Sequence, residues 1–158
     1  TGIIPKIADF AHSHRYLGHA NYTVGTLFEL TRHKMQKVKL TFDKNAGEDQ
    51  FDFIAICNSA YTGGKMMMAP NAHARYGHVE IVLPKIKSRI KMLRLFPLIF
   101  SGKHVELSNV QVMQARTFSV EFPKDSLVLI DGELSIAHKI QGKVMPASWK
   151  LWLSSDDV

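Results

Sequence analysis

The fold is decided by residues 110–133, which read VQVMQARTFSVEFPKDSLVLIDGE. Short apolar runs, partly alternating with polar residues, occupy residues 110–115, 117–122 and 127–130. The turn signals are Pro123-Lys-Asp125 and Asp131-Gly132. Runs of this length, bounded by turn residues, are typical of β-strands rather than helices. The stretch therefore predicts consecutive short strands.

Further strand patterns lie on both sides of this stretch. Residues 37–42 alternate polar and apolar side chains with period two, as a half-buried strand does. A turn is expected at residues 43–49, and the other strand candidates are 51–57, 79–83, 138–141 and 149–153. Many short strands predict a mainly β fold, a sandwich or barrel with a few helical insertions. A parallel doubly wound sheet is disfavoured, because helices do not alternate regularly with the strands.

Two segments carry helical spacing. Residues 9–37 predict a helix in two pieces, the first capped by Asp9 and broken at Gly18, the second beginning at Tyr22. Residues 86–100 mix apolar side chains with lysine and arginine, which predicts a basic amphipathic helix or helix pair interrupted at Pro97.

Length and composition set outer limits on function. The chain has 158 residues, a length that suits one domain, and its first residue is Thr1, so we expect a piece of a longer protein. A single cysteine, Cys57, excludes an internal disulfide and favours a reducing compartment. No apolar run is long enough for a membrane span, and no signal peptide is evident. The net charge of +6 favours anionic partners.

A glycine-containing loop, residues 58–70, follows the predicted strand 51–57. Gly63 and Gly64 permit a tight turn or the close approach of a ligand, and Lys65 beside them can meet a phosphate. The simpler interpretation is a glycine turn with an exposed lysine. The segment is not a P-loop, because the Gly-Lys-Ser/Thr ending is missing. The methionines at 66–68 could line an apolar pocket or belong to the core.

Two carboxylates stand at the end of the apolar run 127–130. Asp131 and Glu133, on either side of Gly132, could act as a general base or hold magnesium-bound water. The alternative is a common Asp-Gly hairpin turn with solvated acids. The histidines are scattered, and none shares zinc-ligand spacing with Cys57, which is expected to be a buried, inert thiol.

The order of several motifs resembles a known family. The motifs are Arg15-Tyr-Leu-Gly18, Tyr22 and Gly25-Thr-Leu27, then Asn58-x-x-Tyr61-x-Gly63-Gly64-x-Met66-x-x-Ala69-Pro70-x-Ala72, then Gly102-Lys103-His104, and finally Asp131-Gly132-Glu133. Together they resemble the C-terminal half of the diacylglycerol kinase catalytic family, which includes diacylglycerol, sphingosine and ceramide kinases and bacterial lipid kinases. The resemblance extends from near residue 2 to about residue 153.

The resemblance implies a β-sandwich that forms the second domain of a two-domain lipid kinase. The family's first domain binds nucleotide through a Gly-Gly-Asp-Gly-Thr loop, which this sequence lacks. Residues 1–158 are therefore expected to be a single domain that is inactive alone and binds no cofactor by itself. ATP and Mg²⁺ would act in the full-length enzyme, a cytoplasmic protein that associates peripherally with membranes.

The resemblance also implies roles for individual residues. Asp131 would be the general base that takes the proton of the lipid hydroxyl, and Glu133 would support it. The candidates for the substrate cleft are Tyr61, Gly63, Gly64, Met66 and Met68. Lys65 replaces a third glycine of many members, and Arg75-Tyr76-Gly77 replaces acids that help hold a structural magnesium in bacterial members. We therefore expect no metal site in this domain.

The basic segment 85–103 has two possible uses. The membrane-facing candidates are Lys87, Arg89, Lys91 and Arg94, with Ile90, Leu93 and Phe96 entering the lipid interface. Alternatively, Ile90 and Leu93 pack on the domain's own sandwich. A non-catalytic lipid- or membrane-binding module remains the alternative function. Nucleic acid is not an expected partner, because interleaved aromatics and a recognition helix are not evident.

Overall fold

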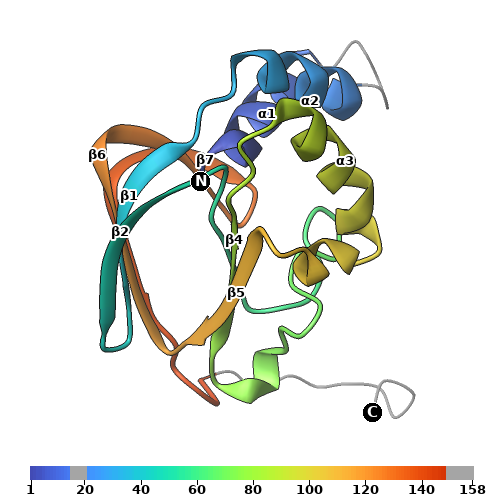
Figure 1. The fold of residues 1–158 in the computed structure, drawn as a ribbon. Coiled ribbons are helices and arrows are strands. Elements are labelled where there is room, and N and C mark those ends of the chain that lie inside the picture. The colour runs from blue at the N-terminus through green and yellow to red at the C-terminus, as the bar shows by residue number, and fades with distance from the viewer. Residues whose placement is uncertain (15–20, 149–158) are drawn as a thin grey trace.

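The computed structural model describes residues 1–14 and 21–148, apart from the side chains of residues 21–23. Within these residues, two antiparallel sheets face one another and helices cover the second sheet (Figure 1). The first sheet has the order β2-β1-β6-β7, with β1 (Gln36–Phe42), β2 (Asn45–Phe51), β6 (Thr117–Ile130) and β7 (Glu133–Lys143). The second has the order β3-β4-β5, with β3 (Ala55–Cys57), β4 (Val79–Pro84) and β5 (Val110–Ala115). The helices are α1 (Ile3–Ser13), α2 (Asn21–Arg32) and α3 (Arg89–Phe100), with 3₁₀ turns at Ala74–Tyr76 and Lys103–Glu106.

Strand β4 lies at the centre of the molecule, and all of its residues are buried. On one face of β4, Val79, Ile81 and Leu83 join the core between the two sheets. We call this the sheet–sheet core, and its buried residues are Val38, Leu40, Phe42, Phe51, Ile54, Val79, Ile81, Leu83, Ala115, Val120, Phe122 and Val128. On the other face of β4, Val82 joins a second core beneath the helices. We call this the helix-side core, and its buried residues are Ile3, Ile7, Leu30, Phe53, Met68, Ala69, Ala72, Val82, Ile86, Met92, Leu95, Ile99 and Val110. Burial on both faces explains why the strand is apolar at every position except Glu80, which is itself buried.

The predicted mainly β sandwich with helical insertions is confirmed. Strands β1 and β4 match the expected segments 37–42 and 79–83 within a residue. Residues 51–57 do not form one strand, because β2 ends at Phe51 and β3 begins at Ala55. The expected turn at 43–49 is also too long, since β2 begins at Asn45. The candidate strand 149–153 lies outside the described residues.

Strands β6 and β7 form a long hairpin rather than the separate short strands expected. The segments 117–122 and 127–130 belong to one strand, β6, whose pairing with β7 shifts between Glu121 and Ser126. Pro123 lies within this shift, and proline has no N–H to donate to the ladder. The expected turn at Pro123 is therefore an irregularity within a strand.

The helices differ from the expectation at their ends. Helix α1 begins at Ile3, so Asp9 lies inside it rather than at its cap, and the expected break at Gly18 lies outside the described residues. Helix α2 begins at Asn21 and ends at Arg32, short of residue 37. Helix α3 runs through Pro97 without interruption.

Helix α3 packs on the sandwich through a different face from the one considered. Met92, Leu95 and Ile99 are buried, whereas Ile90 is 67% exposed and Leu93 is 43% exposed. The alternative in which Ile90 and Leu93 pack on the sandwich is therefore wrong. Of the three expected lipid-facing residues, Phe96 is half-buried against the helix-side core.

Candidate functional site

The turn between β6 and β7 carries the predicted carboxylates. Ile130 pairs with Glu133, so Asp131 and Gly132 form a two-residue loop. Asp131 has φ 47° and Gly132 has φ 93°, the pair of positive values that a type I′ turn requires. Asp-Gly suits such a loop, because Asp tolerates the left-handed region and glycine has no Cβ. The hairpin-turn interpretation of this motif is confirmed.

Asp131 is available to an external partner. Its side chain is exposed and makes no hydrogen bond or ion pair within the part of the chain that the structure describes. Glu133 is exposed as well. The apolar side chains nearest in sequence are also open, since Ile130 is 52% exposed and Ile136 is 70% exposed. A carboxylate on a fixed turn, flanked by exposed apolar residues, can meet an amphipathic substrate or another domain.

The glycine pair Gly63-Gly64 forms the tip of a tight loop. The Thr62 N–H donates to the Met66 carbonyl at 2.9 Å, and the Met66 N–H donates back to Thr62 at 3.2 Å. Both glycines have positive φ, 56° and 84°. Lys65 at this tip is exposed, as is the neighbouring Tyr61. The simple interpretation, a glycine turn with an exposed lysine, describes this geometry.

Other motif residues are held together by packing. Met68 is buried in the helix-side core, and its carbonyl oxygen lies 3.0 Å from Nε2 of the fully buried His104. Gly102 lies so close to this segment that a Cβ there would stand 2.7 Å from Pro70 and 2.8 Å from Met67. The motifs at 66–70 and 102–104 therefore contact each other and form one structural unit. Met66, another of the cleft candidates, is only half-buried.

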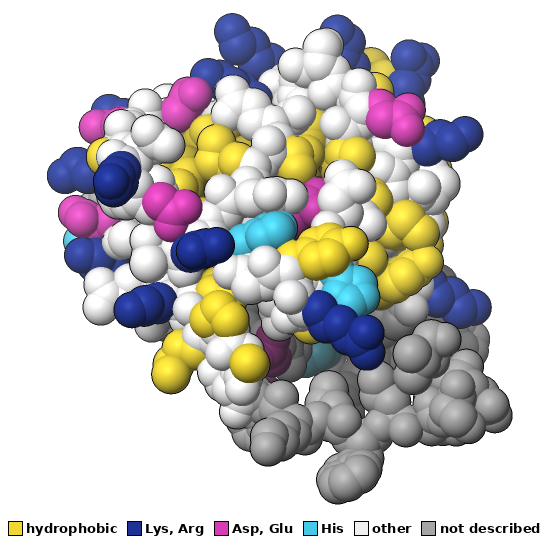
Figure 2. All heavy atoms as spheres, turned by 90° about the horizontal axis from the view of Figure 1, so that it is seen from below, with side chains coloured by type: hydrophobic (Ala, Val, Ile, Leu, Met, Phe, Trp, Pro, Cys, Tyr) yellow, Lys and Arg dark blue, Asp and Glu magenta, His cyan; other side chains and the backbone are white. Residues whose placement is uncertain are grey.

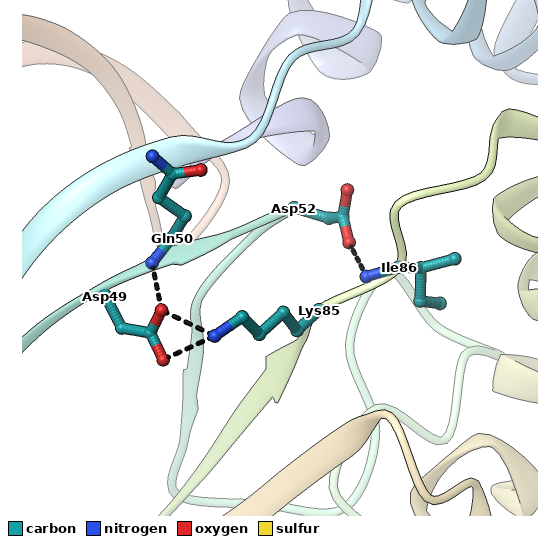
Figure 3. Close-up of polar contacts among 5 residues, drawn as sticks. All are labelled: Asp49, Gln50, Asp52, Lys85 and Ile86. Atoms are coloured by element: carbon teal, nitrogen blue, oxygen red, sulfur yellow. Dashed lines mark hydrogen bonds and ion pairs between the residues drawn. The ribbon is translucent and has the colours of Figure 1, made fainter.

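A buried acid that the sequence reasoning missed lies after β2. Asp52 is 0% exposed; its Oδ1 lies 2.7 Å from Nε2 of His33, and its Oδ2 accepts the Ile86 N–H at 2.5 Å. Figure 3 shows Asp52 beside Ile86 and, near them, the pair of Lys85 and Asp49. The Lys85 Nζ donates to Oδ1 of Asp49 at 2.6 Å. The one sequence signal was an acid inside the apolar stretch 51–57.

Asp52 and His33 line a pocket of about 410 Å³. The α2–β1 connection contributes Lys34, and the segment that enters α3 contributes Lys87 and Arg89. All three cations are exposed. We call this cavity the basic pocket.

Two further ionisable groups face each other across β3 and β4. Cys57 pairs with Glu80, which is 1% exposed. Burial and the neighbouring Glu80 carboxylate raise the pKa of the Cys57 thiol to about 11. Burial also raises the pKa of Glu80. A thiol with a raised pKa is a poor nucleophile, in agreement with the inert cysteine that was expected.

The membrane-facing candidates Lys87, Arg89, Lys91 and Arg94 are all exposed. Basic charge is not confined to them, because lysine and arginine side chains are scattered over the face in Figure 2, along its upper and left edges and near its middle. No helix among the described residues is long and apolar enough to span a membrane. The same residues contain no group of three His, Cys, Asp or Glu that could hold a metal ion.

Residues 73–77 form a short turn, in which His73 and Gly77 flank the 3₁₀ turn Ala74–Tyr76. His73 accepts a hydrogen bond from the Arg75 N–H at 3.1 Å, and its ring lies 5.0 Å from that of Tyr76. Gly77 follows with φ 68°. These residues build a capped 3₁₀ turn from neutral and basic side chains.

Two facing antiparallel sheets with a helical cover and an exposed carboxylate turn define a β-sandwich domain. The chain belongs to the family of the YegS C-terminal NAD kinase beta sandwich-like domain, whose model matches residues 1–153. The resemblance inferred from the motif order is thereby confirmed.

Named relatives agree with this family. The chain is 32% identical over 152 residues to a diacylglycerol kinase of Mycobacterium tuberculosis, strain CDC 1551 / Oshkosh, covering 94% of this chain and 48% of that protein. It is 29% identical over 131 residues to "Probable lipid kinase YegS-like" of Shewanella frigidimarina, covering 83% and 42%. A diacylglycerol kinase structure from Bacillus anthracis str. Sterne shares the fold, with a TM-score of 0.57, 19% identity, and 75% and 43% coverage. The chain spans about half the length of the curated relatives it matches.

Proposed function

We propose that this chain is the C-terminal, substrate-side domain of an ATP-dependent lipid kinase. The reaction would transfer the γ-phosphate of ATP to a hydroxyl of diacylglycerol or a sphingoid lipid. The observation that carries the proposal is Asp131, an exposed carboxylate without a partner among the described residues, fixed at the turn of the β6–β7 hairpin. The lipid-kinase names of the relatives support the same reaction class.

Asp131 would act as the general base. As the lipid hydroxyl oxygen attacks the γ-phosphorus, the new P–O bond forms, the bond to the β-phosphate oxygen breaks and ADP leaves. The hydroxyl proton passes to a carboxylate oxygen of Asp131. Glu133, on the far side of Gly132, would support the local charge. Such catalysis depends mainly on positioning and on electrostatic stabilisation.

ATP and Mg²⁺ would be bound by a separate domain of the full-length protein. The sequence lacks the Gly-Gly-Asp-Gly-Thr loop, and the described residues offer no group of three metal-ligating side chains. Mg²⁺ bound with ATP would neutralise phosphate charge, but the residues present here do not fit a complete site for it. The chain alone is therefore expected to be inactive.

The substrate lipid lies in a membrane, and two neighbouring helices offer a surface for it. Helices α2 and α3 contact each other. Their exposed apolar side chains are Val24, Leu27, Phe28, Ile90, Leu93 and Phe100. The cations Lys87, Arg89, Lys91 and Arg94 accompany them, and the first turn of α3 contains no acid. Apolar insertion combined with cations favours peripheral docking on an anionic cytoplasmic leaflet.

The test is a transfer assay with the full-length protein that contains this chain. Vesicles carrying diacylglycerol, sphingosine or ceramide are incubated with ATP labelled at the γ-phosphate, and lipid label is counted. We expect label on at least one of these lipids, and none when ATP or Mg²⁺ is omitted. Tyr61→Ala and Met66→Ala then test the cleft candidates through the KM for the lipid.

The competing function is a lipid- or membrane-binding module without chemistry. It is favoured by the same exposed side chains of α2 and α3. If no lipid is labelled while the protein still binds anionic vesicles, the kinase proposal fails and the module explains the domain.

A further inference from the structure

The basic pocket joins three segments that lie far apart in the sequence. His33 and Lys34 come from the α2–β1 connection, Asp52 from the end of β2, and Lys87 and Arg89 from the entry to α3. The pocket's volume, about 410 Å³, is at the small end of the range for small-molecule sites. Its walls are tied together, because Asp52 binds both His33 and the Ile86 N–H. The cavity is therefore a built part of the fold.

The charges around this cavity favour an anion. Lys34, Lys87 and Arg89 contribute three positive charges and Asp52 one negative charge, which leaves +2 when His33 is neutral. The neighbouring Asp49 and Lys85 pair with each other and add no net charge. A phosphate monoester carries about 1.5 to 2 negative charges at neutral pH, whereas a diester carries one. The monoester is the better match.

The buried Asp52 carboxylate does not neutralise the cations of the basic pocket, because it has other partners. Asp52 is occupied by His33 and by a backbone amide, both at hydrogen-bond distance. Lys34, Lys87 and Arg89 make no ion pair within the described part of the chain. Cations that surround a cavity without acidic partners are poised for an external anion.

The position of the pocket indicates a lipid as the source of the anion. Arg89 is followed on α3 by Ile90, which is 67% exposed, and His33 follows directly after α2. Helix α2 itself exposes Val24, Leu27 and Phe28. A phosphate held in the pocket would lie close to Ile90, the exposed neighbour of the lining residue Arg89, which could contact an acyl chain.

We propose that the basic pocket binds the phosphate monoester headgroup of an anionic lipid. This inference rests on the proposed function, because a lipid kinase works on membranes and produces lipid phosphate monoesters. It adds a headgroup-selective site to the general membrane surface.

The test compares vesicles of equal surface charge. The full-length protein is sedimented with phosphatidylcholine vesicles that contain either phosphatidic acid, a monoester, or phosphatidylglycerol, a diester. We expect roughly tenfold tighter binding to the monoester vesicles, which corresponds to about 1.4 kcal/mol. Lys34→Gln with Lys87→Gln should remove this preference. The control pair Lys91→Gln and Arg94→Gln, outside the pocket, should weaken binding to both vesicles and keep the preference.

Three results would overturn the inference. The first is equal binding of the native protein to both vesicle types. The second is an equal loss of preference from the pocket pair and the control pair. The third is pocket-dependent binding of soluble glycerol 3-phosphate without vesicle preference, which would identify a free phosphate compound as the ligand. Asp131→Asn should retain the preference, so a failure of the pocket is distinguishable from a failure of the kinase proposal.

Discussion

Strand β4 and the turn end of the β6–β7 hairpin have opposite surroundings, although other residues of β6 are buried in the same core as β4. Every residue of β4 is buried between the sheet–sheet core and the helix-side core. The hairpin, by contrast, ends in exposed Ile130, Asp131 and Glu133. Stability is therefore concentrated around β4, whereas the groups suited to chemistry lie at the exposed turn of the hairpin. Changes in the two regions should therefore produce different phenotypes.

The largest effect on stability is expected from the helix-side core that covers β4. Leu95 on α3 is 0% exposed, so Leu95→Ala should lower the free energy of unfolding by about 3 kcal/mol, since it leaves a cavity. Urea denaturation measures this loss. The matched control is Leu93→Ala on the same helix, where Leu93 is 43% exposed and a much smaller loss is expected. Equal losses would contradict the assignment of the buried face.

A smaller loss is expected at the buried acid beside the basic pocket. Asp52→Ala removes the partner of the Ile86 N–H and of His33, and should cost about 2 kcal/mol. Asp49→Ala is the control, because its pair with Lys85 is half-exposed and is worth about 0.5 kcal/mol or less. Unfolding of both variants is measured by calorimetry. A larger loss for Asp49→Ala would reverse the roles given to these acids.

The hairpin turn should respond to shape rather than charge. Asp131 has φ 47°, a value that Asn tolerates well and Ala does not. We expect Asp131→Ala to destabilise the protein by about 1 kcal/mol and Asp131→Asn to leave stability nearly unchanged. The midpoints of thermal unfolding of the two variants and the native protein measure these differences in stability. Equal destabilisation by both variants would mean that the carboxylate itself stabilises the turn.

The smallest effect concerns the pH dependence set by Glu80 on β4. Because burial raises its pKa, the unfolded chain releases this proton at a lower pH than the folded chain does. Stability should therefore fall as pH rises above the ordinary pKa of 4.5 and through the folded value. In Glu80→Gln this contribution is absent, so its stability should fall less between about pH 4 and pH 7. Parallel stability curves for the two proteins would contradict the prediction.

Local pattern was sufficient for part of the fold. Alternation identified β1, the mainly apolar segment 79–83 was a strand candidate that matches β4, and Asp131-Gly132 identified the hairpin turn. Strand β2 was missed because most of its residues are exposed and carry no apolar alternation. It is a strand because its backbone pairs with β1, which its own side-chain pattern does not reveal. The sequence left open whether Ile90 and Leu93 on α3 face the core or the exterior, since only the packed structure shows which apolar side chains meet the core.

The candidate site also has one part that could be predicted from local sequence and one part that could not. The carboxylate turn was predictable, because two residues with positive φ after a strand have a strong sequence preference. The basic pocket was not, because His33, Asp52 and Arg89 are distant in sequence and meet only in the folded chain. The sequence also did not predict that the motifs at 66–70 and 102–104 meet, through the hydrogen bond between His104 and Met68 and through close packing at Gly102.

The central claim, that Asp131 supplies the base of a lipid kinase, is tested most directly by one kinetic measurement. The full-length protein and its Asp131→Asn variant are compared for kcat, lipid binding and thermal unfolding, with Asp125→Asn as the matched control because Asp125 is an exposed acid on β6. We expect at least about a 100-fold loss of kcat for Asp131→Asn, with lipid binding and unfolding retained, and native turnover for Asp125→Asn. Native turnover in Asp131→Asn would contradict the central claim.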